Sequence, residues 1–134
     1  MSLLADTSVW SLALRRDLPE SVPEVGMLGD ALRRGIGVCT TGLVLQELLQ
    51  GFMGPKARVQ IIERLSALSF LMPQRHDHIE AAELRNRCRR AGVQIETVDA
   101  LLAQLCIHHD LTMLATDRDF THISRHSALK LWKR

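Results

Sequence analysis

Five acidic side chains stand at positions that suit hydrolysis supported by a divalent metal ion. They are Asp6, Glu47, Asp99, Asp117 and Asp119. Carboxylates gathered in one place repel one another, and this repulsion raises some of their pKa values. A hard cation such as Mg²⁺ prefers oxygen ligands and relieves the repulsion, and it can stabilise the attacking and leaving oxygens of a phosphate ester. These residue types therefore predict phosphodiester hydrolysis at an acidic metal site, provided that the fold brings them together.

Each acid also has a simpler explanation when it is taken singly. Asp6 and Asp117 are of a residue type that is common in turns and at helix caps. Asp99 lies in the first turn of an expected helix, where the helix dipole favours a carboxylate by about 0.3–1 kcal/mol. Glu47 has apolar neighbours and no basic residue one helical turn away, but a position at the solvent-exposed edge of a helix explains it equally well. Only the joint placement of the acids favours a shared site.

A histidine site for a softer metal ion has less support from the spacing. His108 and His109 are adjacent, so we expect them to point to different faces of a helix and not to form a paired zinc site. His76 and His78 have a spacing that suits a strand, but they precede an expected helix. We therefore expect structural or surface roles for all six histidines.

Strand and helix patterns alternate along the chain. Short apolar runs predict strands at residues 3–5, 38–40, 70–72, 111–115 and 129–132. Helical periods predict helices at residues 9–14, 25–36, 43–50, 77–90 and 97–109, with another beginning at Pro55. Pro19 and Pro23 indicate a connection, Thr7 or Ser8 is expected to cap the first helix, and Thr97 is expected to cap the last.

This alternation predicts an α/β fold with a parallel central sheet of four to five strands flanked by helices. Ligands of such sheets bind beyond the carboxyl ends of the strands. Asp6 and Asp117 each follow an expected strand, so we expect them at the same edge of the sheet. The length of 134 residues predicts one domain, residues 1–134.

Composition excludes several other classes of protein. Hydrophobic residues make up 46% of the chain and charged residues 24%, which argues against disorder, and the sequence contains no apolar run of the roughly 20 residues that a membrane helix needs. The three cysteines form no CxxC pair, so we expect a reduced, cytoplasmic protein without a disulfide framework. The absence of Tyr and an aromatic content of 4% disfavour a module that binds RNA by base stacking.

Four motifs, in order, resemble those of the PIN-domain ribonucleases. They are Asp6-Thr7-Ser8-Val9-Trp10, Gln46-Glu47-Leu48-Leu49-Gln50-Gly51, Thr97-Val98-Asp99-Ala100-Leu101-Leu102-Ala103 and Ala115-Thr116-Asp117-Arg118-Asp119-Phe120. Each motif is weak alone, but their order and the chain length resemble the VapC type, the toxin half of bacterial and archaeal toxin–antitoxin pairs. The resemblance covers essentially the whole chain.

The resemblance implies roles for the acids and for two threonines. Asp6, Glu47, Asp99 and Asp117 would hold Mg²⁺ or Mn²⁺, and Asp119 lies where some members place a further ligand. Thr7 and Thr116 would orient carboxylates or a metal-bound water. The implied activity is endoribonucleolytic cleavage of RNA, often tRNA or rRNA. The implied partners are a cognate antitoxin and a second copy of the chain, with no membrane association.

The basic residues leave two interpretations open. With 17 Lys and Arg against 15 Asp and Glu, gathering four acids at one site leaves a basic remainder that suits a polyanionic substrate, although a solvated mixed surface is an equally ordinary explanation. Arg85, Arg87, Arg89 and Arg90 concentrate charge on one expected helix, where they either contact phosphates or form a solvated face.

Two rival functions are less well supported. An aspartate-nucleophile phosphatase normally has a second Asp two residues after its first, and Ser8 occupies that position here. The alternative function from another class is a non-catalytic RNA-binding or protein-interaction module that has kept the PIN fold. Retention of the four acids argues against it, because a protein that no longer needs catalysis usually loses such residues.

Overall fold

A computed structural model describes residues 1–15 and 22–133. Its centre is a five-stranded, wholly parallel sheet with the strand order β3-β2-β1-β4-β5. The strands are β1 (Leu3–Ala5), β2 (Val38–Thr41), β3 (Ser69–Leu71), β4 (Thr112–Leu114) and β5 (Lys130–Leu131). The predicted α/β class and parallel sheet are confirmed.

The first strand lies in the middle of the sheet because its sequence is continuously apolar. Leu3, Leu4 and Ala5 are completely buried, as expected for a parallel strand with helices on both faces. Leu3 pairs with Val38 of β2, and Leu4 pairs with Met113 of β4. The strand is thus held on both sides, and its last residue fixes where the following acid must lie.

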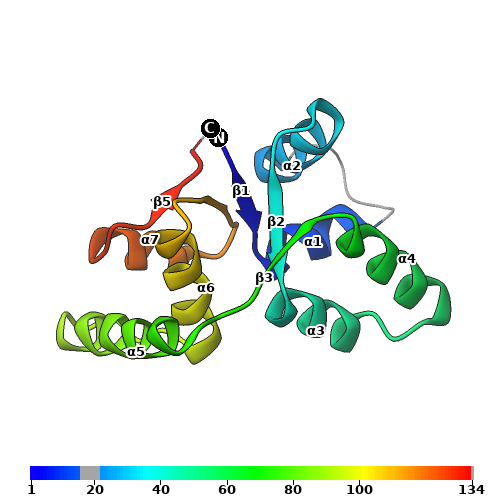
Figure 1. Ribbon diagram of the computed structural model, residues 1–134. Helices are drawn as coiled ribbons and strands as arrows, with labels where there is room; N and C mark the ends of the chain where they lie inside the picture. The colour runs from blue at the N-terminus through cyan, green and yellow to red at the C-terminus, as the bar shows by residue number, and fades with distance from the viewer. Residues whose placement is uncertain (16–21, 134) are drawn as a thin grey trace.

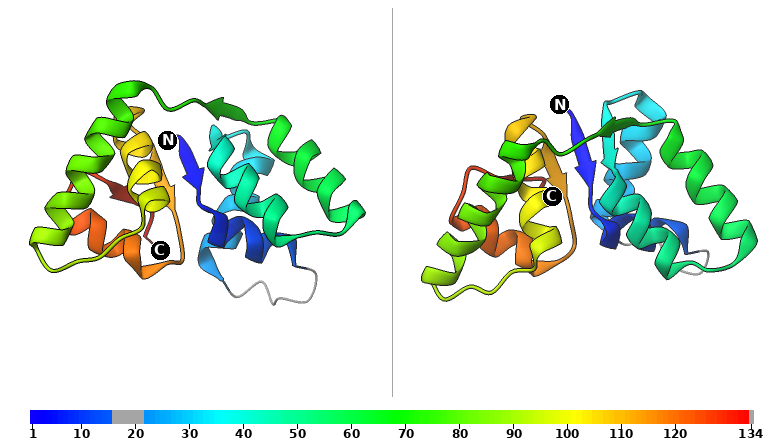
Figure 2. Two further views of the ribbon diagram at one scale, coloured as in Figure 1. Left: turned by 90° about the horizontal axis from the view of Figure 1, so that it is seen from below. Right: turned by 60° about the horizontal axis from the view of Figure 1, so that its bottom comes forward.

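Within residues 1–15 and 22–133, seven helices cover the two faces of the sheet (Figures 1 and 2). One layer contains α1 (Thr7–Leu14), α2 (Pro23–Arg34), α3 (Gly42–Gly51) and α4 (Pro55–Ser66). The other layer contains α5 (Arg75–Arg90), α6 (Thr97–His108) and α7 (Arg118–Arg125). In the part of the chain that the structure describes, no helix is both long enough and apolar enough to cross a bilayer.

The order of the strands places a topological switch point between β1 and β4. The chain adds β2 and then β3 on one side of β1, and it returns to add β4 and β5 on the other side. The backbone N–H of Asp6 donates to the carbonyl of Leu114 at 3.0 Å, so the carboxyl ends of β1 and β4 lie side by side. Open α/β sheets bind their ligands at such a point.

The structure corrects two local predictions, both about helix caps. Asp6, rather than Thr7 or Ser8, caps α1, because its side chain accepts from the backbone N–H of Val9. Glu96 occupies the N-cap position of α6 without a side-chain hydrogen bond, and Thr97, the expected cap, is the first helical residue.

Helix α7 was not predicted at all. It is short and buries only two apolar residues, Phe120 and Ile123. The periodic signal in the sequence is therefore weak. The other helices match the prediction to within a few residues at each end, the accuracy expected for helix boundaries. The predicted connection at Pro19 lies outside the described residues, whereas Pro23 is the first residue of α2.

The central position of β1 generates a prediction about stability. Replacement of Leu4 by Ala leaves a cavity between the two helical layers and should lower the free energy of unfolding by about 2–5 kcal/mol. Val59→Ala is the control, because Val59 on α4 is 56% exposed and its truncation should change stability by no more than about 0.5 kcal/mol. Urea unfolding followed by circular dichroism measures both values, and equal effects of the two substitutions would contradict this account of the core.

Candidate active site

The fold brings the acidic residues to the carboxyl edge of the sheet by way of helix starts. Asp6 is the N-cap of α1, Asp117 is the N-cap of α7, and Asp99 lies in the first turn of α6. Glu47 comes from the middle of α3, the helix that follows β2. These residues come from segments up to 111 positions apart in the chain, and the switch point between β1 and β4 is where they meet.

Three of the carboxylates form a compact group. One oxygen from each of Asp99, Asp117 and Asp119 lies within 4.8 Å of the others. Asp117 is oriented by the first turn of α7, because its Oδ1 accepts the backbone N–H of Asp119 at 2.9 Å. Asp117 and Asp119 therefore both face Asp99 across the gap between α7 and α6.

Asp6 is the most deeply buried of the five acids, with 4% of its surface exposed. Burial is the main reason why the pKa of Asp6 rises to about 6, and the carboxylates of Asp117 and Glu47 raise it further. Hydrogen bonds from the Ser8 hydroxyl at 2.6 Å and from the Val9 backbone N–H at 3.3 Å act in the opposite direction. Asp6 is thus held in one orientation but lacks a compensating charge.

Asp99 experiences the strongest effect of its neighbours. Its pKa is raised to about 7, mainly by burial and in addition by the charges of Asp117, Asp119, Glu96 and Asp6. Near neutral pH this carboxyl group is therefore divided between its protonated and ionised forms. The pKa values of Asp6 and Asp99 show that the acids interact electrostatically as one cluster.

Hydroxyl groups connect the acids to the scaffold. The Thr116 hydroxyl donates to Ser8 Oγ at 2.9 Å, and the Ser8 hydroxyl donates to Asp6 Oδ1 at 2.6 Å. The Thr7 hydroxyl donates to Glu47 Oε1 at 2.6 Å. Thr7 thus contacts a carboxylate directly, whereas Thr116 reaches one only through Ser8.

Glu47 lies both at the solvent-exposed edge of a helix and beside the acidic site, the two explanations that the sequence left open. Its side chain is exposed to solvent, as expected at the edge of a helix. It is also held by Thr7 and lies close enough to Asp6 to raise the pKa of that residue. Glu47 therefore lies at the solvent-facing side of the cluster.

Two contributors were missed in the sequence. Ser8 was considered only as a cap, although a hydroxyl two residues after an acid has the spacing to bond its side chain. Glu96 raises the pKa of Asp99 from the N-cap position of the same helix. Its position three residues before Asp99 could have indicated that the two carboxylates lie close together, because residues three apart lie on the same side of a helix.

The donor set fits a hard divalent cation. Within the described residues, none of the five carboxylates takes part in a salt bridge; the aspartates that do are Asp30, Asp77 and Asp110. The cluster therefore contains uncompensated negative charge and oxygen donors only, which is the chemistry that Mg²⁺ and Mn²⁺ prefer. Burial and the neighbouring carboxylates raise the pKa values of Asp6 and Asp99, and a divalent cation among these oxygens would offset the repulsion.

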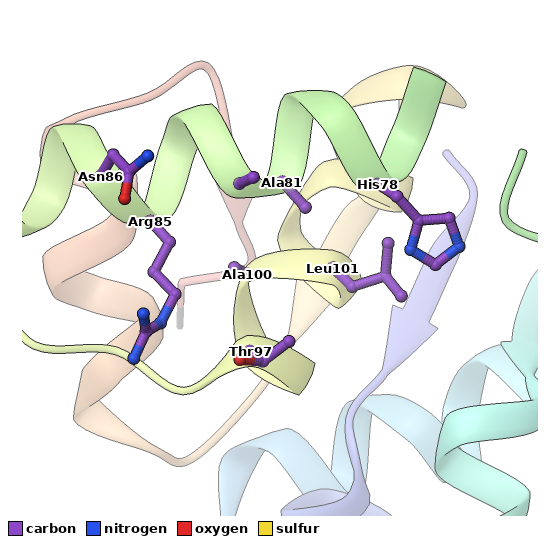
Figure 3. Close-up of a pocket in the computed structure, with 8 residues that line it drawn as sticks. His78, Ala81, Arg85, Asn86, Thr97, Ala100 and Leu101 are labelled. Atoms are coloured by element: carbon purple, nitrogen blue, oxygen red, sulfur yellow. The ribbon is translucent and has the colours of Figure 1, made fainter. Parts of the chain in front are cut away.

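A cavity of about 230 Å³ lies between α5 and α6 and is lined by none of the five acids. Figure 3 shows Arg85 extending from α5 toward Thr97 at the start of α6. The Arg85 Nε–H donates to the carbonyl of Ile95 at 2.8 Å, and the Arg87 Nε–H donates to the carbonyl of His126 at 3.0 Å. At least two of the four clustered arginines thus anchor α5 to neighbouring segments and do not form a purely solvated face.

Comparisons with known proteins identify the family and the fold of the chain. The family model described as the PIN domain matches residues 3–126. Among curated proteins, no sequence matches this chain. Similar solved structures include VapBC2 from Rickettsia felis bound to a promoter DNA fragment, with 20% identity, a TM-score of 0.77 and coverage of 99% of this chain and 100% of that chain.

Two further structures have the same fold. VapBC-1 from nontypeable Haemophilus influenzae has 14% identity and a TM-score of 0.72 over 99% of this chain and 98% of that chain. The sarcin-ricin loop cleaving toxin VapC20 from Mycobacterium tuberculosis has 21% identity and a TM-score of 0.64 over 89% and 92%. At these identities the similarity establishes the fold.

The raised pKa values generate a prediction about stability and pH. The folded chain keeps protons on Asp6 and Asp99 up to about pH 6 and about pH 7, whereas the ordinary value is 3.8. The folded state therefore binds more protons than the unfolded state, and stability must fall as the pH rises through this window. In EDTA, the free energy of unfolding should fall between about pH 4 and about pH 7, with Asp99 contributing about 1–2 kcal/mol after allowance for its partial exposure.

Asp99→Asn provides the comparison, because it removes one of the two titrating groups and keeps the shape of the side chain. Urea unfolding at each pH should give a shallower decline for this variant than for the wild type. An identical pH dependence for both proteins would show that Asp99 carries no raised pKa.

Proposed function

The chain belongs to the PIN domain family, and from this membership and the acidic cluster we propose that it is a metal-dependent endoribonuclease, the VapC-type toxin of a toxin–antitoxin pair. The observation that carries the proposal is the meeting of Asp6, Asp99, Asp117 and Asp119 at one edge of the sheet without a basic counter-charge among the described residues. A protein that only bound RNA would have no need of this unfavourable arrangement.

The proposed metal ligands are the carboxylates of the cluster. They are Asp6, Glu47, Asp99, Asp117 and Asp119. A bound Mg²⁺ or Mn²⁺ supplies activation of water and stabilisation of negative charge at a phosphodiester. Ser8 holds the Asp6 carboxylate in place, and Thr7 does the same for Glu47 at the solvent-facing side. Because the second oxygen of each carboxylate is left free by these bonds, both acids remain available as ligands.

RNA is the proposed substrate, with tRNA and rRNA as the classes to test first. One of the similar structures is described as a toxin that cleaves the sarcin-ricin loop. Arg89 and Arg90 at the exposed end of α5 supply positive charge for phosphate contacts, which add affinity without sequence information.

An antitoxin is the proposed protein partner, since several similar structures are VapBC assemblies. We further propose a homodimer and a cytoplasmic location, both in line with the VapC resemblance. The whole of residues 1–134 is proposed to act as a single PIN nuclease domain.

Asparagine substitutions test the roles of the acids. Asp6→Asn and Asp99→Asn each remove a charge and keep the side-chain shape, so RNA cleavage with Mg²⁺ present should fall by about 100-fold or more. Glu63→Gln is the matched control, because Glu63 is an exposed acid on α4, and its activity should equal that of the wild type. Cleavage of a labelled RNA pool, resolved on a denaturing gel, measures the rates. Full activity in both asparagine variants would refute the proposal in favour of a non-catalytic module.

A second test concerns the hydroxyl that positions Asp6. Ser8→Ala removes the 2.6 Å bond to the carboxylate and should weaken Mg²⁺ binding by about 10-fold, in line with other residues that orient metal ligands. Ser124→Ala is the control, because its hydroxyl bonds only a backbone carbonyl within α7. The Mg²⁺ concentration that produces half of the rise in melting temperature measures the affinity. The role assigned to Ser8 fails if the two alanine variants need the same concentration.

A further inference from the structure

A second group of metal-ligand side chains lies at the other end of α6. His76 and Asp77 belong to the first turn of α5, and His108 is the last residue of α6. Asp99 lies nine residues before His108 on the same helix, which corresponds to about 14 Å along the axis. The group is therefore separate from the acidic cluster at the carboxyl edge of the sheet.

The three side chains converge on one carboxylate oxygen. Asp77 Oδ1 lies 2.8 Å from His108 Nδ1 and 3.4 Å from His76 Nε2. One ligand atom from each residue lies within 4.8 Å of the other two, and the centroids of the two imidazole rings are 4.4 Å apart. A tetrahedral ion with bonds of about 2.0–2.2 Å separates its ligand atoms by about 3.4 Å. The distance from His76 to Asp77 already has this length, whereas the 2.8 Å hydrogen bond between His108 and Asp77 must lengthen when an ion enters.

The carboxylate is held by groups behind it. Asp77 is completely buried, and its Oδ2 accepts the backbone N–H of Gln74 at 2.9 Å as part of a capping box. The Gln104 amide lies 3.4 Å from Oδ1. Carboxylates that bind metal ions are typically fixed by such surrounding hydrogen bonds, with one oxygen directed at the ion.

A simple structural role does not account for both histidines. A buried carboxylate needs hydrogen-bond donors, and His108, Gln104 and the Gln74 N–H already provide three. His76 adds a third nitrogen to the same oxygen while half of its own side chain remains in solvent. Two imidazoles around one oxygen, both reachable from solvent, are better explained by an ion that binds between them.

We propose that His76, Asp77 and His108 form a Zn²⁺ site that joins the first turn of α5 to the last turn of α6. Two imidazole nitrogens and one carboxylate oxygen favour Zn²⁺ over Mg²⁺, and water from the exposed side completes the coordination. A small rotation of the half-exposed His76 ring makes room for the ion. The site stabilises the packing of α5 on α6 and takes no part in the proposed nuclease chemistry.

Cobalt provides a direct probe, because Co²⁺ substitutes for Zn²⁺ and absorbs visible light when it is bound by nitrogen ligands. The titration uses the full chain with excess Mg²⁺, which fills sites made of oxygen ligands alone. The wild type should bind one Co²⁺ with a visible absorption band that added Zn²⁺ abolishes. His76→Gln and His108→Gln should each weaken Co²⁺ binding by about 10-fold or more.

The controls separate this site from the acidic cluster and from a folding defect. His78→Gln alters an exposed histidine on the same helix and should bind Co²⁺ as the wild type does, and Asp99→Asn should also retain the absorption band. His76→Gln keeps the bond between His108 and Asp77, so it tests the site even if His108→Gln fails to fold. The proposal is overturned if His76→Gln and His78→Gln bind Co²⁺ equally, or if Asp99→Asn removes the band.

Thermal unfolding gives an independent measurement. Zn²⁺ at about 100 times its dissociation constant should raise the melting temperature of the wild type by about 5–10 °C, and His76→Gln, with its site weakened by about 10-fold or more, should show about half of that rise or less. RNA cleavage by His76→Gln should remain Mg²⁺-dependent, so loss of the zinc site and loss of the nuclease activity have different signatures. Equal melting shifts in the two proteins would overturn the proposal.

Discussion

The mutual repulsion of carboxylates at the switch point is the constraint to which the rest of the structure responds. Burial raises the pKa values of Asp6 and Asp99, and the neighbouring acids, four of them around Asp99, raise both values further. The arrangement opposes folding near neutral pH, so it persists because the surrounding core is stable enough to impose it. The buried strand β1 and its pairing with β2 and β4 provide that core.

Hydroxyl groups hold the mutually repelling carboxylates in defined positions. The bonds from Thr116 to Ser8 and from Ser8 to Asp6 connect the ends of β4 and β1, and the bond from Thr7 to Glu47 connects α1 to α3. Each hydroxyl donates its hydrogen toward the acids and brings no positive charge. The carboxylates are therefore fixed in position while their charge stays available for a cation, which an Arg or Lys partner would have prevented.

Sequence patterns were sufficient for the sheet and for the positions of the acids, because both depend on local signals. A continuous apolar run followed by an acid, as in Leu3–Ala5 and Asp6, reports a buried strand and its carboxyl end together. The histidine group could not be found in this way, because His76 and His108 are 32 positions apart and meet only through the packing of α5 on α6. The stacking of His108 on His109, with centroids 4.2 Å apart, also contradicts the expected separation of adjacent residues. His109 follows the last residue of α6, so helical spacing no longer governs its direction.

The direction of the helices explains how a cluster of carboxylates is tolerated at this position. Asp6, Asp99 and Asp117 stand at the N-termini of α1, α6 and α7, where the helix dipole stabilises a negative charge by about 0.3–1 kcal/mol. Three positive helix ends thus face the three carboxylates. The pKa of Asp99 nevertheless stays near 7, so the dipoles reduce the repulsion without cancelling it. The opposite end of α6 carries His108, where the same dipole favours a cation. The two proposed metal sites therefore lie at opposite ends of the buried helix α6. The oxygen-only site is at its first turn, and the site with nitrogen ligands is at its last turn.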